Sequence, residues 1–178
     1  EYLIKSPIIK KVSFTGSTPI GKKLAALASL HMKQCTMELG GHAPVIICDD
    51  ADIDNAVETL VNYKFKNAGQ VCISPTRFYV QENVYQEVVQ KITKRTQHIK
   101  VGNGLDRNSQ MGPLAQTRRI GAMLKIVEDA QKKGATIQTG GYAIEGKGNY
   151  FMPTVISDLT NDMNFMNDEP FGPVIGLV

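Results

Sequence analysis

The stretch that decides the fold is "PVIICDDADIDNAVETLVNYKF", residues 44–65. It begins with "PVIIC", an apolar run of strand length. Acidic residues follow at Asp49, Asp50 and Asp52, and the segment from Ile53 to Phe65 has helical character. Carboxylates at this place lie at the positive end of a helix dipole. The stretch therefore predicts a strand followed directly by a helix over residues 53–65.

The same alternation of strand-length apolar runs and helical periodicity continues along the chain. Upstream, a strand ending in "VSF" (12–14) precedes a helix over residues 19–30, which Ser17 or Thr18 can cap and whose first turn suits Pro19. Downstream, we predict a strand at "RFYVQ" (77–81), helices over 84–98 and 117–133, a long loop at 101–113, and strands within 136–141 and 150–159. Such alternation is typical of a parallel α/β sheet.

Composition and charge limit the kind of protein. The 178 residues are 42% hydrophobic and carry a net charge of +3 that is not concentrated in any block, so a nucleic-acid partner is not expected. The longest apolar runs fall far short of the roughly 20 residues that cross a bilayer, and no signal peptide is visible, which favours a cytoplasmic protein without membrane contact. The chain begins with Glu and ends in an apolar run, so we expect a piece of a longer protein.

The three cysteines differ in their surroundings. They are odd in number and include no C-x-x-C pair, so neither a disulfide framework nor a metal site is indicated. Cys35 and Cys48 lie in or beside predicted strands, which favours a structural role. Cys72 lies in "NAGQVCISPTR" (67–77), where glycine, serine and proline mark a loop between a helix and a strand. Free cysteines are usually small buried hydrophobic residues, whereas functional residues are often found in loops. Cys72 is therefore either a residue that fills the core or a nucleophile.

"GSTPIGKK", residues 16–23, nearly matches the phosphate-binding P-loop, with Lys22 in the lysine position. Lys23 stands where a P-loop has the Ser or Thr that holds Mg²⁺, so phosphate hydrolysis is not expected. A strand, a glycine turn and a helix N-terminus still form an anion site through free amides, where the pyrophosphate of a dinucleotide could rest. The alternative is an ordinary strand-to-helix turn.

Two further stretches present a carboxylate beside glycine. "MELGG" (37–41) places Glu38 among apolar residues, surroundings that favour a carboxyl group able to act as a general base near neutral pH. The alternative is a Glu at a strand edge that faces water. "NDEPFGPV" (167–174) places Glu169 before two prolines that flank Phe171 and Gly172. This is either a rigid turn that offers an acid and an aromatic ring to a ligand, or a loop whose Phe is buried.

In this order, "FTGS", "ELGG", "GQVC" and "EPFGPV" resemble the motifs of the aldehyde dehydrogenase superfamily, and the resemblance extends along all 178 residues. "KFKNAGQVCISPTR" and "ELGGHAPVIICDDADIDNAV" are most similar to the branch that contains succinate-semialdehyde dehydrogenases. The resemblance implies a three-layer α/β fold, a mostly parallel twisted sheet with helices on both faces. It also implies that residues 1–40 are the terminal part of a dinucleotide-binding domain and residues 41–178 a catalytic domain truncated at its C-terminus.

The resemblance further implies NAD(P)-dependent oxidation of a small-molecule aldehyde, such as succinate semialdehyde, to the acid. Cys72 would be the nucleophile, its backbone amide would help to hold the oxyanion, and Glu38 would activate the water that hydrolyses the thioester. For NAD or NADP, the implied contacts are Ser17 near the pyrophosphate, Leu39 and Gly40 beside the nicotinamide, Glu169 on a ribose and Phe171 against the ring. Ser74 stands where some semialdehyde relatives have a second cysteine, which excludes a disulfide switch there.

Several expectations concern what this chain lacks. The family's upstream portion supplies an oxyanion donor and the adenosine pocket, so we expect a chain that folds without turning over, from a parent that is a homo-oligomer. One alternative is a cofactor-independent thiol hydrolase that uses Cys72 with His42. Another is a non-catalytic fragment, favoured only if Cys72 is buried and unreactive. Arg77 could bind a substrate carboxylate, but a surface salt bridge is the preferred interpretation.

Overall fold

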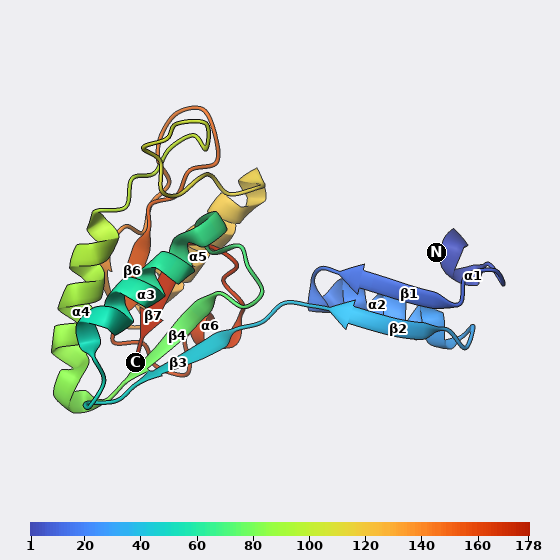
Figure 1. The fold of residues 1–178 in the computed structure, drawn as a ribbon, viewed down its shortest axis with the longest axis horizontal. Helices are drawn as coiled ribbons and strands as arrows, with labels where there is room; N and C mark the ends of the chain where they lie inside the picture. Colours follow the sequence, from blue (N-terminus) through green and yellow to red (C-terminus); the bar gives the residue numbers. More distant parts are fainter. The chain divides into compact units, whose positions relative to one another are not determined.

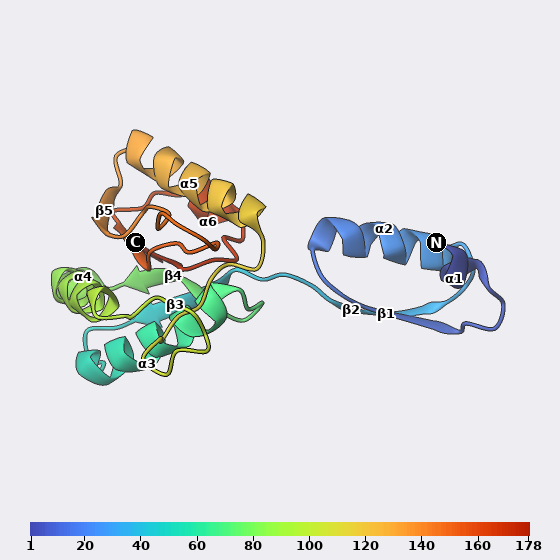
Figure 2. The same cartoon turned by 90° about the horizontal axis from the view of Figure 1, so that it is seen from above.

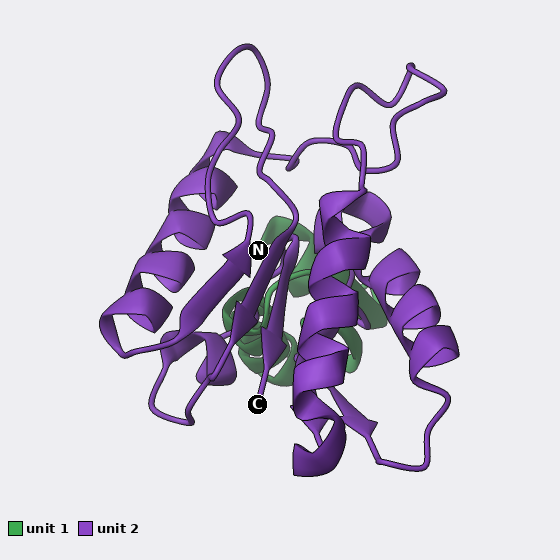
Figure 3. Cartoon of the chain, turned by 90° about the vertical axis from the view of Figure 1, so that its left-hand side faces the viewer, with its two compact units in different colours: residues 1–41 green, residues 42–178 purple.

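The computed structural model describes all 178 residues and divides into two compact units, residues 1–41 (unit 1) and residues 42–178 (unit 2). Figure 3 distinguishes the two units by colour. Each unit has its own sheet, and each is described by itself.

Unit 1 is a small βαβ unit preceded by a one-turn helix, α1 (Tyr2–Lys5). Strands β1 (Lys11–Thr15) and β2 (Gln34–Glu38) pair in parallel, from Lys11 opposite Gln34 to Thr15 opposite Glu38. Helix α2 (Thr18–Ser29) connects them and packs on both strands. The predicted helix over 19–30 differs from α2 by one residue at each end, and Pro19 lies in its first turn as expected.

Unit 2 contains a five-stranded sheet with the order β3-β4-β7-β6-β5. Its strands are β3 (Ala43–Ile47), β4 (Pro75–Val80), β5 (Thr136–Thr139), β6 (Thr154–Ser157) and β7 (Val174–Leu177). All neighbouring pairs are parallel except β5 with β6, which is antiparallel. The sheet is therefore mostly parallel, as predicted.

Helices cover both faces of this sheet, which makes unit 2 a three-layer structure (Figures 1 and 2). Helices α3 (Ile53–Phe65) and α4 (Glu82–Gln97) pack against each other on one face. Helix α5 (Thr117–Lys132) and the one-turn helix α6 (Asn164–Asn167) lie together on the other. A 3₁₀ segment, η1 (Lys66–Gly69), leads from α3 toward β4. Covering both faces buries the central strands, and every residue of β6 and β7 is buried.

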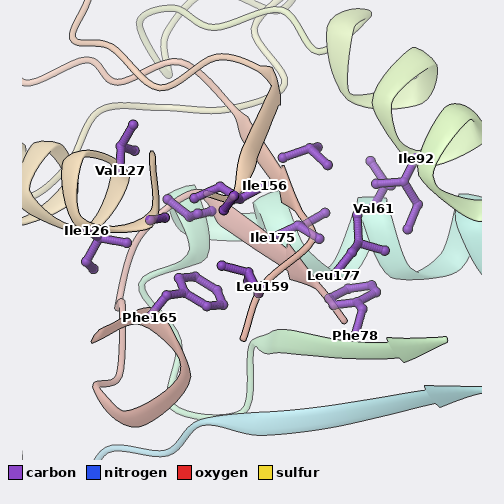
Figure 4. Packing of buried hydrophobic residues seen from close by; sticks show 14 of the residues in the cluster. Val61, Phe78, Ile92, Ile126, Val127, Ile156, Leu159, Phe165, Ile175 and Leu177 are labelled. Carbon is purple, nitrogen blue, oxygen red and sulfur yellow. The ribbon is translucent and has the colours of Figure 1, made fainter. Parts of the chain in front are cut away.

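The core of unit 2 forms between these layers. Figure 4 shows side chains of strands β4, β6 and β7 meeting those of the helices on the two faces. Phe78, Ile156 and Ile175 are fully buried strand residues, and Val61 of α3 and Ile92 of α4 pack from one side. Burying a side chain of this size contributes about 1.5–3 kcal/mol, so each of these residues stabilises the packing of the helices on the sheet.

Most predicted elements agree with the structure. The predicted helix over 53–65 matches α3 at both ends, and the Asp52 side chain caps it by accepting a hydrogen bond from the Asn55 amide at 3.0 Å. Helix α4 begins two residues before the predicted 84–98 segment, and α5 ends one residue before Lys133. Strands β5 and β6 are shorter than the predicted runs, because glycines and Pro153 interrupt the pairing between them.

Candidate active site

The sheet order of unit 2 brings two of the sequence motifs together. The Cys72 loop directly precedes β4, and the segment from Glu169 to Pro173 directly precedes β7. Strands β4 and β7 are parallel neighbours, with Arg77 opposite Gly176 and Phe78 opposite Leu177 (Figure 1). Because the strands run in the same direction, the segments that precede them lie at the same edge of the sheet. The "GQVC" and "EPFGPV" motifs therefore share one edge.

Cys72 lies in an exposed turn between η1 and β4, in which the Ser74 amide donates to the Val71 carbonyl at 3.0 Å. The side chain is a free thiol that solvent can reach. The core-filler interpretation of Cys72 is therefore wrong for this chain. A buried Cys72 would have favoured a non-catalytic fragment, and this condition is not met.

The approach to Cys72 has an unusual backbone. Asn67, Ala68 and Gly69 have φ values of 49°, 53° and 70°, three consecutive residues in the left-handed region. Residues other than glycine occupy this region at a cost, so the surrounding structure has to hold them there. Such a backbone is typical of functional loops, and here it sets the path of the chain into the thiol-bearing turn.

Side-chain amides hold this approach in place. The Asn67 side chain donates to the Gln70 carbonyl at 3.1 Å, and the Gln70 side chain donates back to the Asn67 carbonyl at 3.0 Å. The Gln70 side-chain oxygen also accepts from the Ala115 amide at 2.9 Å. Gln70 is buried, so these bonds are at least partly shielded from water. The Cys72 loop is thereby connected to the segment before α5.

A contact between two glycines joins the motifs directly. A Cβ built on Gly69 would lie 2.2 Å from the carbonyl oxygen of Gly172, so no larger residue fits without moving the backbone. Gly172 is confined as well, because a Cβ there would lie 2.3 Å from the Met123 sulfur of α5. Sequence reasoning identified both glycines only as turn residues. Their close approach depends on tertiary packing and leaves no sequence signal beyond the glycines themselves.

Phe171 is presented by a turn that α5 anchors. Its φ is 39° and its side chain is 37% exposed, so the alternative of a buried Phe in this loop is wrong. One Arg119 nitrogen, Nη2, donates to the carbonyls of Pro170 and Phe171, the latter at 3.4 Å. Burial lowers the pKa of Arg119, Arg118 lowers it further, and the charge of Glu169 opposes the change. Arg119 is a support of this turn that the sequence analysis missed.

Lys64 is a second cation near Glu169. Its side chain, on the last turn of α3, is fully buried, and burial lowers its pKa to about 7 against the opposing charge of Glu169. A sequence signal for this burial exists, because Ile53, Val57, Val61 and Lys64 follow the spacing of one helix face. A lysine that continues an apolar stripe could therefore have been recognised.

A hollow of about 650 Å³ lies beside these motifs. Asn67, Gln70 and Phe171 line it, together with residues 113–115 and 148–149. Cys72 is not part of its lining but follows Gln70 by two residues. The hollow thus links the approach to the thiol with the exposed ring of Phe171, and a ligand that contacts Phe171 can extend into it.

Unit 1 gathers the remaining predicted site residues at one end of its sheet. Thr15 and Glu38 are paired at the carboxyl ends of β1 and β2, and the Gly16 amide donates to the Glu38 carbonyl at 3.0 Å. Ser17, in the turn before α2, therefore lies close to the backbone of Glu38. Leu39 packs over Gly21 of α2, since a Cβ on that glycine would lie 2.5 Å from a Leu39 methyl carbon. Gly40 follows directly.

The structure bears on two alternatives that the sequence left open in unit 1. Ser17 is the residue before the first turn of α2, but its side chain makes no capping hydrogen bond, and the residue is exposed. Glu38 is exposed at the end of β2, which agrees with the alternative of a Glu at a strand edge that faces water. Both side chains are accessible to a ligand at the carboxyl edge of the two strands.

His42 does not serve Cys72. Its Nε2 donates to the Phe165 carbonyl at 2.7 Å, and its Nδ1 lies 2.7 Å from the Thr76 hydroxyl oxygen. Burial lowers its pKa, which favours the neutral ring. With both ring nitrogens engaged in packing unit 2, the proposed Cys72–His42 pair is wrong. Arg77 is not a surface salt-bridge partner either, since its Nη2 donates to the His42 carbonyl at 2.6 Å.

Cys35 lies in β2 and Cys48 directly follows β3, as expected, but both are exposed rather than buried. No group of three or more His, Cys, Asp or Glu side chains is arranged to hold a metal ion. Among the helices, none has both the length and the apolar composition needed to cross a bilayer.

Comparison with known proteins identifies the family. A model of the aldehyde dehydrogenase family matches residues 1–178. The chain is 47% identical over 173 residues to the NADP(+) succinate-semialdehyde dehydrogenase 2 of Schizosaccharomyces pombe, covering 97% of this chain and 35% of the relative. It is 44% identical over 174 residues to a putative 4-(hydroxymethyl)benzenesulfonate dehydrogenase of Comamonas testosteroni, covering 98% and 36%.

Solved structures give the same answer. The crystal structure of an NADP-dependent enzyme of E. coli superimposes with a TM-score of 0.96 at 39% identity, covering 99% of this chain and 37% of that one. A lactaldehyde dehydrogenase of Escherichia coli superimposes with a TM-score of 0.92 at 38% identity, covering 96% and 36%. The chain spans about a third of the length of these relatives. Family model, relatives and fold agree that the chain belongs to the aldehyde dehydrogenase family.

Proposed function

We propose that this chain carries the nucleophile and the general base of an NAD(P)-dependent oxidation of an aldehyde to its carboxylic acid. The observation that carries the proposal is the exposed Cys72 thiol on a loop that packs, through Gly69 and Gly172, against the segment bearing Glu169 and Phe171. A family model that matches the whole chain supports it. Aldehyde oxidation is general to the family, whereas the roles of individual residues are our assignment.

The residues present fit a dinucleotide. In unit 1, the Ser17 hydroxyl lacks a capping bond and faces solvent at the N-terminus of the 12-residue helix α2, which suits a pyrophosphate. Leu39 and Gly40 would contact the nicotinamide. In unit 2, Glu169 would accept hydrogen bonds from ribose hydroxyls, and Phe171 offers an exposed ring beside the hollow. When bound, NAD or NADP supplies the hydride acceptor.

The chemistry assigned to the chain's own residues has two parts. The Cys72 thiolate adds to the aldehyde carbon, and the backbone amide of Cys72 donates a hydrogen bond to the oxygen that becomes negative. After hydride loss, the acyl group remains on the Cys72 sulfur as a thioester. Glu38 then takes a proton from water, whose oxygen forms the new bond to the acyl carbon while the thiolate leaves. The carboxylic acid and the free thiolate are the products.

The substrate class is a separate part of the proposal. The Schizosaccharomyces pombe relative is named for succinate semialdehyde and NADP, which makes this aldehyde and this cofactor the first pair to test. Arg77 does not support a carboxylated substrate, because its guanidinium is directed to the His42 carbonyl. A carboxylate-binding residue would therefore have to be another one.

Alkylation of the three cysteines across a pH series tests the nucleophile. All three thiols are exposed, so differences in labelling rate report activation rather than access. With iodoacetamide and peptide mass spectrometry, we expect Cys72 to react faster than Cys35 and Cys48. Equal rates for the three cysteines would contradict an activated Cys72. The Cys72→Ser variant serves as the assignment control.

Acylation tests the base. A p-nitrophenyl ester should transfer its acyl group to Cys72, and the lifetime of this adduct can be followed by intact mass. We expect the adduct to persist longer in Glu38→Gln than in the unmodified chain, because water is no longer deprotonated. An unchanged lifetime would remove Glu38 from the mechanism while leaving Cys72 in place. Because we expect this chain to fold without turning over, it should not reduce NADP⁺ with succinate semialdehyde, and robust turnover would contradict that expectation.

A further inference from the structure

Lys64 is a buried cation that the proposed chemistry does not use. Its side chain has no exposed surface, and its Nζ has no hydrogen-bond partner. Removing an ammonium group from water without satisfying its three N–H donors is costly, so proteins rarely keep such a group without a function. The function has to come from what lies around the Nζ atom.

The position of Nζ is defined by the glycine contact. It lies 3.3 Å from the place that a Cβ on Gly69 would occupy, and that same point is 2.2 Å from the Gly172 carbonyl oxygen. Lys64 therefore extends from the last turn of α3 to the junction between the Cys72 loop and the segment from Glu169 to Gly172. A cation at this junction acts on both motifs.

The charges around this junction come from several elements. Glu169 is the opposite charge that acts on Lys64, and Lys64 in turn acts on His42. Arg119 of α5 also acts on Glu169, but its Nη2 already donates to the carbonyls of Pro170 and Phe171. Arg77 and Asp168 act on His42 with opposite signs. Lys64 Nζ makes no hydrogen bond at all, whereas Arg119 is held to the turn through Nη2 and leaves only its Nε without a partner.

We propose that Lys64 is a positioning residue for the Glu169 carboxylate, a cation fixed at the Gly69–Gly172 junction that keeps this carboxylate oriented toward the ribose hydroxyls of a bound dinucleotide. The assignment of a ribose to Glu169 rests on the proposed function. Lys64 itself touches no ligand, because it has no exposed surface. Its charge state changes near neutral pH, since burial lowers its pKa to about 7, so the orientation of Glu169 depends on pH in that range.

Titration of Lys64 by NMR tests the coupling without any ligand. In the 178-residue chain with ¹³C-labelled lysine, the Cε signal of Lys64 should titrate near pH 7 and should be absent in Lys64→Met. The Lys66→Met variant is the matched control, because Lys66 is exposed two residues away. In Glu169→Gln the titration should move down by about one pH unit, because the opposing charge is lost. The same midpoint with and without the Glu169 charge would overturn the proposal.

Binding of nicotinamide mononucleotide tests the positioning. We expect Lys64→Met and Glu169→Gln each to weaken binding several-fold, read from the ring signals of Phe171, and the double variant to bind no more weakly than Glu169→Gln alone. Lys66→Met should bind like the unmodified chain. Loss of binding in Glu169→Gln but not in Lys64→Met would overturn the role of Lys64. If the unmodified chain does not bind the nucleotide, the cofactor assignment fails, and the lysine titration alone decides whether Lys64 holds Glu169.

Discussion

Replacing Lys64 by methionine should change how the stability of the chain depends on pH. The pKa of Lys64 falls from 10.5 in the unfolded chain to about 7 in the folded one, mainly through burial. Between these values the unfolded state holds a proton that the folded state has released, so the free energy of unfolding rises with pH in this range. The slope for one such group is about 1.4 kcal/mol per pH unit. Integrated from pH 7 to 10.5, the cost of burying the charge amounts to about 5 kcal/mol.

Methionine has a similar length and no charge, so Lys64→Met removes this cost. We expect the variant to be more stable than the unmodified chain at pH 7 and below, with a difference that shrinks by about 1.4 kcal/mol per pH unit above pH 7. Urea denaturation followed by circular dichroism at several pH values measures it, with Lys66→Met as the control. Cysteine and tyrosine titrations are common to all variants and cancel in the difference. A difference that does not change with pH, or a less stable Lys64→Met at neutral pH, would refute the burial argument.

Three further predictions concern single contacts. Gly69→Ala should destabilise unit 2 by about 3 kcal/mol, because φ is +70° and the new Cβ would meet the Gly172 carbonyl. The control Gly121→Ala, at an exposed position inside α5, should instead stabilise unit 2 by about 0.5–1 kcal/mol. Thermal denaturation compares the two variants, and equal effects would argue against the glycine contact. Because the pKa of His42 is lowered in the folded chain, the free energy of unfolding should fall as the pH drops below about 6.5, where only the unfolded state binds the proton. In urea denaturation, His42→Gln should show a weaker dependence of stability on pH. An unchanged pH dependence would assign the titration to another group. Asp52→Ala should lower the free energy of unfolding by about 1 kcal/mol, because it removes the side-chain cap of α3, and Asp54→Ala should lower it by less. Calorimetry of the two variants measures the difference.

Much of unit 2 could be predicted because its signals are local. The bounds of α3 follow from periodicity and an acidic cap, both of which act within a few residues. The exposed position of Cys72 follows from the glycine, serine and proline residues of its loop, which cannot continue a helix or a strand. The apolar run at the end of the chain was interpreted as a strand, and β7 lies there. The one-turn helix α6 was not predicted, because a run of four residues carries too little pattern to identify.

The candidate site was only partly predictable for the same reason. Periodicity places Lys64 on the buried face of α3 but cannot state that Glu169, more than one hundred residues later, provides the charge that acts on it. His42 was a plausible base for Cys72 until its two ring nitrogens were found on Thr76 and Phe165. The sequence also could not reveal that Arg119 supports the Phe171 turn.

The sequence by itself determined the class of fold, the order of its longer helices and strands, and the four motifs that resemble one family. These are properties of short stretches, in which propensity, capping and periodicity act between near neighbours. Only the tertiary structure decided which stretches meet. Placing β7 beside β4 brings the Glu169 segment to the Cys72 loop and makes both Gly69 and Gly172 necessary. That choice depends on the packing of the whole core, whose free energy is shared among residues distant in sequence.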